Sequence, residues 1–150
     1  MPPLIDIGLN LTHDSFDKDR AEVLQRATDA GMVAAILTGS TAECSRHALE
    51  LARTKPGLLF STSGVHPHHA VDCDDSTIAS LRDIASAPEV VAIGECGLDF
   101  FRNYSPPEVQ EKWLIQMTLH PILCLLSLSA CRSAGRLMGT WPQSSLPQKQ

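Results

Sequence analysis

Short apolar runs alternate with longer stretches of mixed polarity along the first 120 residues. Each run is four or five residues long, which is typical of strands covered on both faces of a parallel sheet. Strands are therefore expected at residues 4–7, 33–37, 58–62 and 90–93. The intervening stretches predict helices at residues 17–30, 42–54, 75–87 and 106–119.

Small polar residues and prolines mark where the helices should begin. Thr41 can cap the second helix, and Asp75 with Ser76 can cap the third. Ser105-Pro-Pro-Glu108 has the form of a capping box, with Pro106 at the first helical position. Four strand-then-helix units in succession imply parallel strands with right-handed crossovers, hence an α/β fold that is either a doubly wound sheet or a TIM-type (β/α)8 barrel.

Composition narrows the class of protein and the compartment. The chain has 150 residues, the size of one domain. Its net charge of −5 argues against binding nucleic acid through a broad basic surface, although a local metal site could still bind phosphate. Five cysteines without a CxxC pair predict reduced thiols. The first residues lack the basic and apolar regions of a secretory signal, so we expect a cytoplasmic protein in which Asn10 is not glycosylated.

The last part of the chain has a different composition. All 17 acidic residues lie at or before Glu111, so residues 112–150 have none. The apolar stretch near residue 122 is too short and too interrupted to span a membrane. We expect at best a fifth strand at residues 122–128 and disorder at residues 140–150, and divide the chain into a domain at 1–118 and a divergent tail at 119–150.

A carboxylate follows the fourth apolar run directly. Glu95 lies between Gly94 and Gly97, at the carboxyl end of a predicted buried strand. Active sites of parallel α/β proteins are built at that edge, and the glycines allow a sharp turn and close approach of a ligand. Glu95 is therefore a candidate functional residue, although a solvated turn residue is an equally good interpretation of this segment alone.

Further chemistry-bearing residues are expected at the same edge. His66, His68 and the adjacent His69 follow the third strand, and Asp6 lies near the end of the first. Together with Glu95, these side chains could form a hard-cation site with oxygen and imidazole ligands. A surface loop of histidines would have the same spacing.

Arg102 follows Asp99 by three residues, just beyond the fourth strand. Its guanidinium could stabilise a phosphoryl oxygen, or it could simply pair with Asp99.

Three segments give the chain a specific resemblance. Asp6-Ile-Gly-Leu-Asn10, Gly64-Val-His66-Pro-His68 and Val90-Val-Ala-Ile-Gly-Glu-Cys-Gly-Leu-Asp-Phe100 resemble motifs of the TatD family of metal-dependent deoxyribonucleases. The resemblance covers about residues 4–112. It implies a (β/α)8 barrel that holds one or two divalent ions, often Mg²⁺, at its strand ends and hydrolyses DNA phosphodiesters, with Glu95 as a metal ligand.

The chain also departs from the family pattern. Where the family carries Asp-x-His-x-His, the first strand has Gly8 and Asn10, and Ala130-Cys131-Arg132 stands where a ligating histidine is expected. A complete barrel needs about 250 residues, so only about its first half is present. His120 lies too early to replace the missing ligand. A change of reading frame or exon between residues 113 and 130 would explain both the lost motifs and the lost acidic residues.

The first hypothesis is a TatD-like hydrolase acting on DNA, either single strands or DNA ends, and impaired in this form. The resemblance implies that a divalent ion held by Glu95, and by Asp6, activates a water for attack on phosphorus. His66 or His68 would contact the phosphate and Arg102 would neutralise charge.

Two alternatives remain open. One is a noncatalytic half-barrel that associates through an exposed sheet edge. The other is a related hydrolase of a different ester or amide.

Overall fold

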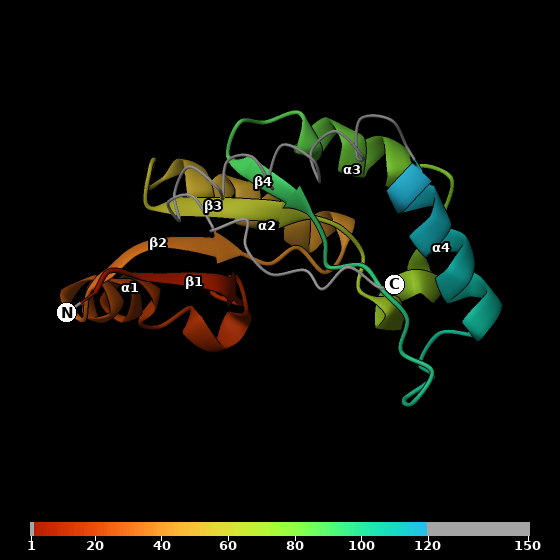
Figure 1. Cartoon of the computed structure of the whole chain (residues 1–150), viewed down its shortest axis with the longest axis horizontal. Helices are drawn as coiled ribbons and strands as arrows, with labels where there is room; N and C mark the ends of the chain where they lie inside the picture. Colours follow the sequence, from red (N-terminus) through yellow and green to blue (C-terminus); the bar gives the residue numbers. More distant parts are fainter. Residues whose placement is uncertain (1, 120–150) are drawn as a thin grey trace, which may run out of the picture.

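The computed structural model describes residues 2–119 and forms one parallel sheet with helices packed along it (Figure 1). The strands are β1 (Leu4–Leu9), β2 (Met32–Leu37), β3 (Leu59–Ser63) and β4 (Val90–Ile93). The α-helices are α1 (Arg20–Asp29), α2 (Ala42–Arg53), α3 (Thr77–Ala85) and α4 (Pro107–Leu119). Two short 3-10 helices, η1 (Asp14–Phe16) and η2 (Pro67–Asp72), follow β1 and β3.

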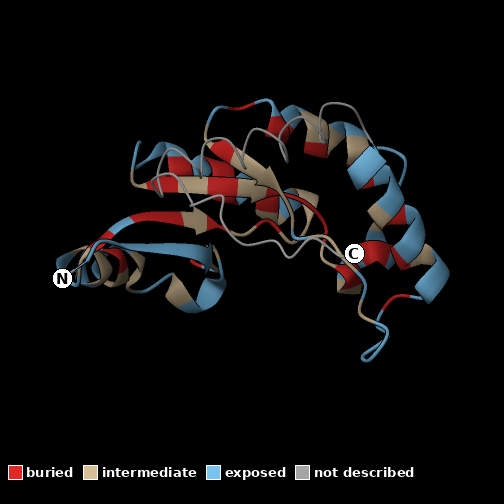
Figure 2. Ribbon diagram, in the orientation of Figure 1, coloured by how far each residue is buried: buried red, intermediate tan, exposed pale blue. Residues whose placement is uncertain are grey.

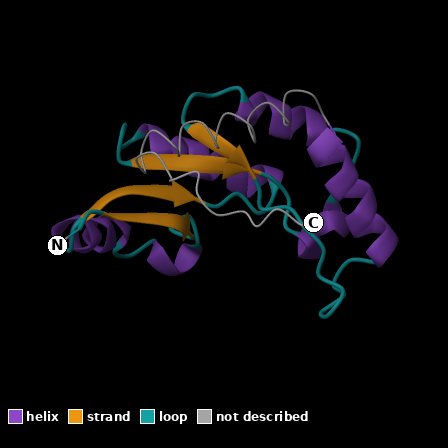
Figure 3. Ribbon diagram, in the orientation of Figure 1, coloured by secondary structure: helices purple, strands orange, loops and turns teal. Residues whose placement is uncertain are grey.

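The strands lie in the order β1-β2-β3-β4, and every neighbouring pair is parallel. All four therefore end at the same edge of the sheet, so that η2 and α4 lie beyond the strand arrowheads (Figure 3). The predicted α/β alternation is confirmed. In the described residues β1 and β4 form the two open edges.

Three helix starts differ from the prediction. The first helix begins at Arg20 rather than at residue 17, because η1 occupies part of the expected stretch. Ser76 is the N-cap residue of α3, as predicted, but its side chain makes no capping bond. Instead the Asp74 carboxylate accepts from the backbone N–H groups of Ser76 (2.9 Å) and Thr77 (3.1 Å). The fourth helix begins at Pro107. The Ser105 hydroxyl bonds to η2, so the predicted capping box is not what the structure shows.

Two apolar clusters form the core. One lies between β2 and the helices α1 and α2, and includes Leu37 and Leu59. The other joins α3 and α4 to η2 and the start of β4, and includes Leu81 and Trp113. The second cluster anchors the elements that carry the histidines and Glu95, because η2 and β4 border it.

The β1 edge is poorly covered. Figure 2 shows β1 exposed along most of its length, whereas β3 is mostly buried or intermediate. Three apolar side chains of β1 remain in solvent: Ile7 is 75% exposed, Leu4 is 50% exposed and Ile5 is 39% exposed. This is the uncovered apolar surface expected of four open strands.

Within residues 2–119 the thiols of Cys44, Cys73 and Cys96 are free. Within this described range no helix is long and apolar enough to cross a membrane. The predicted fifth strand, the disordered tail and His120 lie outside the described residues.

Candidate functional site

The loops that follow β2, β3 and β4 are joined by backbone hydrogen bonds at one edge of the sheet. The His66 N–H donates to the Ser40 carbonyl (2.9 Å), and the Glu95 N–H donates to the Gly39 carbonyl (2.7 Å). The Gly94 N–H donates to the Ser63 carbonyl (3.0 Å). The loop after β2 therefore fixes the backbone positions of both His66 and Glu95.

Gly64 allows the ends of β3 and β4 to touch. A Cβ atom at this position would collide with the Gly94 carbonyl carbon and lie 2.5 Å from the Glu95 carbonyl oxygen. Gly94 itself has φ +154°, a conformation that residues with a side chain rarely adopt. Gly94 thus has a backbone conformation that favours glycine, and the chain bends at the next residue, Glu95. These two glycines place Glu95 directly beside the start of the His66 loop.

His66 caps η2 with its side chain. Its Nδ1 accepts a hydrogen bond from the His68 backbone N–H (3.1 Å), so the neutral ring carries its proton on Nε2. Burial lowers the pKa of His66, while the Glu95 carboxylate acts in the opposite direction. At neutral pH the ring is therefore an uncharged Nε2–H donor near Glu95.

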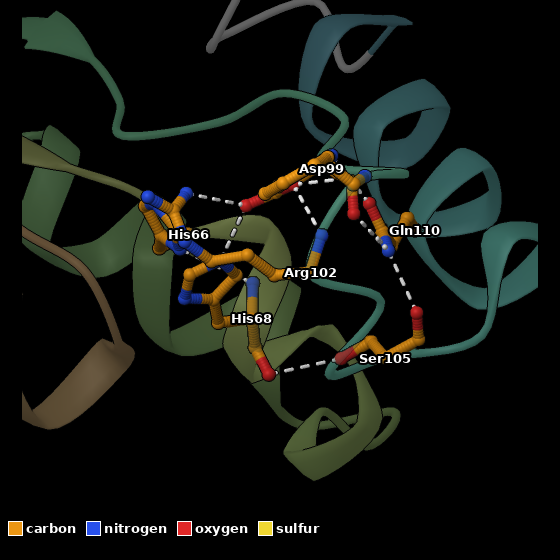
Figure 4. Close-up of polar contacts among 7 residues, drawn as sticks. His66, His68, Asp99, Arg102, Ser105 and Gln110 are labelled. Atoms are coloured by element: carbon orange, nitrogen blue, oxygen red, sulfur yellow. Dashed lines mark hydrogen bonds and ion pairs between the residues drawn. The ribbon is translucent and has the colours of Figure 1, made fainter.

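His68 is held by Asp99 from the loop after β4. Its Nε2 lies 2.6 Å from Asp99 Oδ2, and the ring packs edge-on against His66 and Tyr104 at centroid distances of 4.2 and 4.7 Å. Figure 4 shows His68 and Asp99 facing each other across the two loops. Because the Asp99 carboxylate accepts this bond, His68 Nε2 is the donor and Nδ1 of the neutral ring has the lone pair.

Asp99 is stabilised in its ionised form. The backbone N–H and Nη1 of Arg102 donate to it at 3.0 Å each, and the Phe101 N–H donates at 3.1 Å. The Arg102 backbone bond, the His68 bond and the Arg102 side chain hold the pKa of Asp99 far below its usual range. The structure thus shows the pairing of Arg102 with Asp99 that the sequence allowed. The Arg102 side chain is still 58% exposed, so its charge faces solvent at this edge.

The two predicted metal ligands are placed differently. Glu95 is exposed, and its carboxylate raises the pKa of His66 against the larger effect of burial. Asp99 also raises this pKa, whereas His68 and His69 lower it. Asp6 is exposed on β1, where its Oδ1 accepts a hydrogen bond from the Gly8 N–H (3.0 Å). It is not among the groups that shift the pKa of His66. Among residues 2–119 no three His, Cys, Asp or Glu side chains lie close enough together to hold a metal ion.

Sequence reasoning missed Gln110, and it assigned Ser105 to a helix cap rather than to the site. Both are buried, and both bond to the segment that carries Asp99 and His68 (Figure 4). Gln110 shares the buried side of α4 with Trp113 and Met117, at a spacing of three and seven residues. A glutamine on an otherwise apolar helix face needs an internal partner, so this spacing was the available signal.

The four parallel strands define an α/β protein whose polar site lies in the loops after β3 and β4, at the carboxyl ends of the strands, where (β/α) barrels build their active sites. The comparisons with known proteins give the family. The model of the family described as TatD related DNase matches residues 5–119, and the chain belongs to this family.

Curated relatives support the assignment. The chain is 48% identical over 132 residues to the 3'-5' ssDNA/RNA exonuclease TatD of Erwinia tasmaniensis, covering 87% of this chain and 51% of the relative. It is 52% identical over 108 residues to the protein of that name from Pantoea vagans, covering 72% and 42%. The chain thus spans about half the length of these relatives. A match over 87% of 150 residues also extends beyond residue 112, further than the motifs indicated.

Two solved structures share the fold. A TatD homologue from Escherichia coli K12 has a TM-score of 0.68 at 30% identity, over 75% of this chain and 44% of that one. A TatD family hydrolase from Entamoeba histolytica has a TM-score of 0.70 at 26% identity, over 88% and 56%. The expected fold is confirmed: four parallel strands alternate with helices as in about half of a TatD barrel.

Proposed function

We propose that this chain provides the phosphate-contacting side of a metal-dependent nuclease that acts on single-stranded DNA. The observation that carries the proposal is the arrangement at the ends of β3 and β4, where the neutral His66 ring is acted on by the Glu95 charge and where His68 and the exposed Arg102 side chain both bond to the Asp99 carboxylate. The family membership and the relatives named as ssDNA/RNA exonucleases support it.

The histidines and the arginine have separate roles in this proposal. The neutral His66 ring donates from Nε2 to a phosphoryl oxygen, and Arg102 offsets the charge that develops there. His68 donates its Nε2–H to the Asp99 carboxylate, so the neutral ring has its lone pair on Nδ1, which can accept from a water or a sugar hydroxyl. RNA would be bound through the same phosphate chemistry.

Glu95 and Asp6 are this chain's proposed contribution to a divalent-metal site, with Mg²⁺ as the expected ion. Mg²⁺ prefers six oxygen ligands, several of them waters. The described residues do not fit a complete ion site, because no group of three donors lies together within them. We therefore assign no step of the reaction to an ion bound by these residues alone.

The test is a nuclease assay on the purified 150-residue chain with Mg²⁺ and 5'-labelled single-stranded DNA. Shortening of the labelled strand by the wild type, and its loss in Glu95→Gln, is the expected result. Glu111→Gln is the matched control, because Glu111 is exposed on α4 and should leave the rate unchanged. Equal rates in the wild type and Glu95→Gln would remove Glu95 from the site, and an inactive wild type would contradict hydrolysis by this chain.

The exposed β1 edge favours a second candidate function, a noncatalytic half-barrel that associates with further copies. Parallel strands with unpaired edges and uncovered apolar side chains are a template for pairing. Analytical ultracentrifugation of the wild type should show association that increases with concentration, and Ile7→Glu should reduce it. Phe101→Glu, at a loop position 93% exposed, controls for the added charge. A monomeric wild type at all concentrations would exclude this function.

A further inference from the structure

We propose that Gln110, together with Ser105, is a positioning residue of the site: it fixes Asp99 against His68 from α4. This inference rests on the proposed function, because it concerns how the proposed phosphate-contacting side is held in place. Neither residue is expected to touch substrate, since both are buried.

The Gln110 amide bonds to both backbone polar groups of Asp99. The Asp99 N–H donates to Gln110 Oε1 (2.7 Å), and Gln110 Nε2 donates to the Asp99 carbonyl (3.3 Å). A residue held at its N–H and its carbonyl has little freedom to rotate. The Asp99 carboxylate is therefore kept pointing at His68, where a 2.6 Å contact depends on its direction.

Ser105 holds His68 from the opposite side. Gln110 Nε2 also donates to the Ser105 carbonyl (2.6 Å), and the Ser105 hydroxyl donates to the His68 carbonyl (3.0 Å). The same hydroxyl accepts from the Val71 N–H (3.0 Å), which ties it to η2.

The contacts close into a ring that runs from the His68 imidazole through Asp99, Gln110 and Ser105 to the His68 carbonyl (Figure 4). Three segments of the chain meet in it: η2, the loop after β4, and α4. Both the side chain and the backbone of His68 are thereby fixed relative to the loop that begins at Glu95.

Because the part of the hydrogen-bond ring formed by Gln110 and Ser105 is buried, loss of any one of its bonds would destabilise the protein. Gln110 is 1% exposed and Ser105 is fully buried, so each polar group without its partner would carry a desolvation cost. A glutamine needed only for packing could be replaced by an apolar residue of similar shape. The positioning role predicts instead that such a replacement releases Asp99 and alters His68.

The test compares Gln110→Met with Gln116→Met in the full chain. Both changes exchange glutamine for a side chain of similar length on α4, but Gln116 is exposed. Nitrogen-15 spectra of the His68 ring at fixed pH report whether Nε2 keeps its proton in the bond to Asp99. The nuclease assay gives kcat and KM separately.

Gln110→Met should lose the protected Nε2–H signal of His68 while circular dichroism shows intact helices, and kcat should fall about 10- to 100-fold with little change in KM. Gln116→Met should leave all three readouts unchanged. An unaltered His68 signal in folded Gln110→Met would overturn the proposal.

Two further outcomes are separable. If the wild type does not cleave DNA, the proposed function fails, but the ring spectra still decide the positioning role. If Gln110→Met does not fold, Ser105→Ala takes its place, because it removes the hydroxyl link to His68 and Val71 and leaves the Gln110 amide intact. An unchanged His68 signal in Ser105→Ala would then overturn the proposal.

Discussion

The half of the sheet formed by β3 and β4, called here the β3–β4 side, differs from the β1 side in how far the described residues cover it and bond to its polar groups. On the β3–β4 side, His68 and Asp99 lie in a closed ring of hydrogen bonds above a core that contains Leu81 and Trp113. On the β1 side, Asp6 bonds to the amide two residues further along, and Ile7 faces solvent. The first side is organised by its own contacts, whereas the second presents an apolar strand that gains stability from whatever covers it.

The largest expected effect of this difference concerns two leucines near the start of their strands. Leu59 on β3 is 1% exposed and Leu4 on β1 is 50% exposed. Leu59→Ala should lower the free energy of unfolding by about 2–5 kcal/mol, because it leaves a cavity in the core. Leu4→Ala should cost less than about 1 kcal/mol. Urea denaturation of both variants measures the difference.

Equal losses would mean that β1 is as well covered in solution as β3. A second urea series at tenfold lower protein concentration would then separate the possible causes. A cost of Leu4→Ala that depends on concentration would indicate that other copies of the chain cover the strand.

Two glycines give the next effect. A Cβ atom at Gly64 would collide with backbone at the end of β4, whereas one at Gly8 on β1 meets nothing within 4 Å. Backbone cannot move aside as a flexible side chain can, so Gly64→Ala should destabilise the fold by about 1–3 kcal/mol and displace Glu95. Gly8→Ala should be close to neutral. Thermal unfolding and the amide spectrum of Glu95 check both variants, and an unshifted Glu95 amide in Gly64→Ala would contradict the close approach.

Strand positions could be predicted from the sequence because each strand is a short local run of apolar residues. Glu95 could be placed at the sheet edge for the same reason, since it directly follows the run at residues 90–93. The pairing of His68 with Asp99 could not, because the residues are 31 positions apart and their loops meet only once β3 and β4 pair.

The sequence did not identify the correct hydrogen bonds at the helix starts where a residue had more than one possible partner. Ser76 is the N-cap residue of α3 as predicted, but the Asp74 carboxylate, rather than that of Asp75, accepts hydrogen bonds from the N–H groups at the start of the helix. Ser105 has the spacing of a helix cap, but its hydroxyl bonds to His68 and Val71 across the loop. Sequence spacing identifies a residue that can cap a helix, while packing of η2 against α4 decides which bond forms.

Protonation of the Asp99 carboxylate at low pH should destabilise the β3–β4 side. Its pKa is lower in the folded protein than in the unfolded chain, where an aspartate has a pKa of about 3.9. Its stabilisation is therefore fully present above that value and is lost as the pH falls toward the folded pKa. The difference in unfolding temperature between the wild type and Asp99→Asn should be largest near pH 6 and shrink between pH 4 and pH 2. A difference that stays constant over this range would show that Asp99 acts without its charge.

The smallest effect is the one that separates the two predicted metal ligands. Glu95 raises the pKa of His66 against the effect of burial, and Asp6 is not among the groups that act on it. Glu95→Gln should therefore lower the pKa of His66 further, while Asp6→Asn should leave it unchanged, as measured by proton NMR titration of the ring. Because the coupling acts through space, it weakens with distance and with screening by solvent. If Asp6→Asn also lowered the pKa of His66, β1 would bring its carboxylate to the β3–β4 side in solution, and the two proposed ligands would lie in one site.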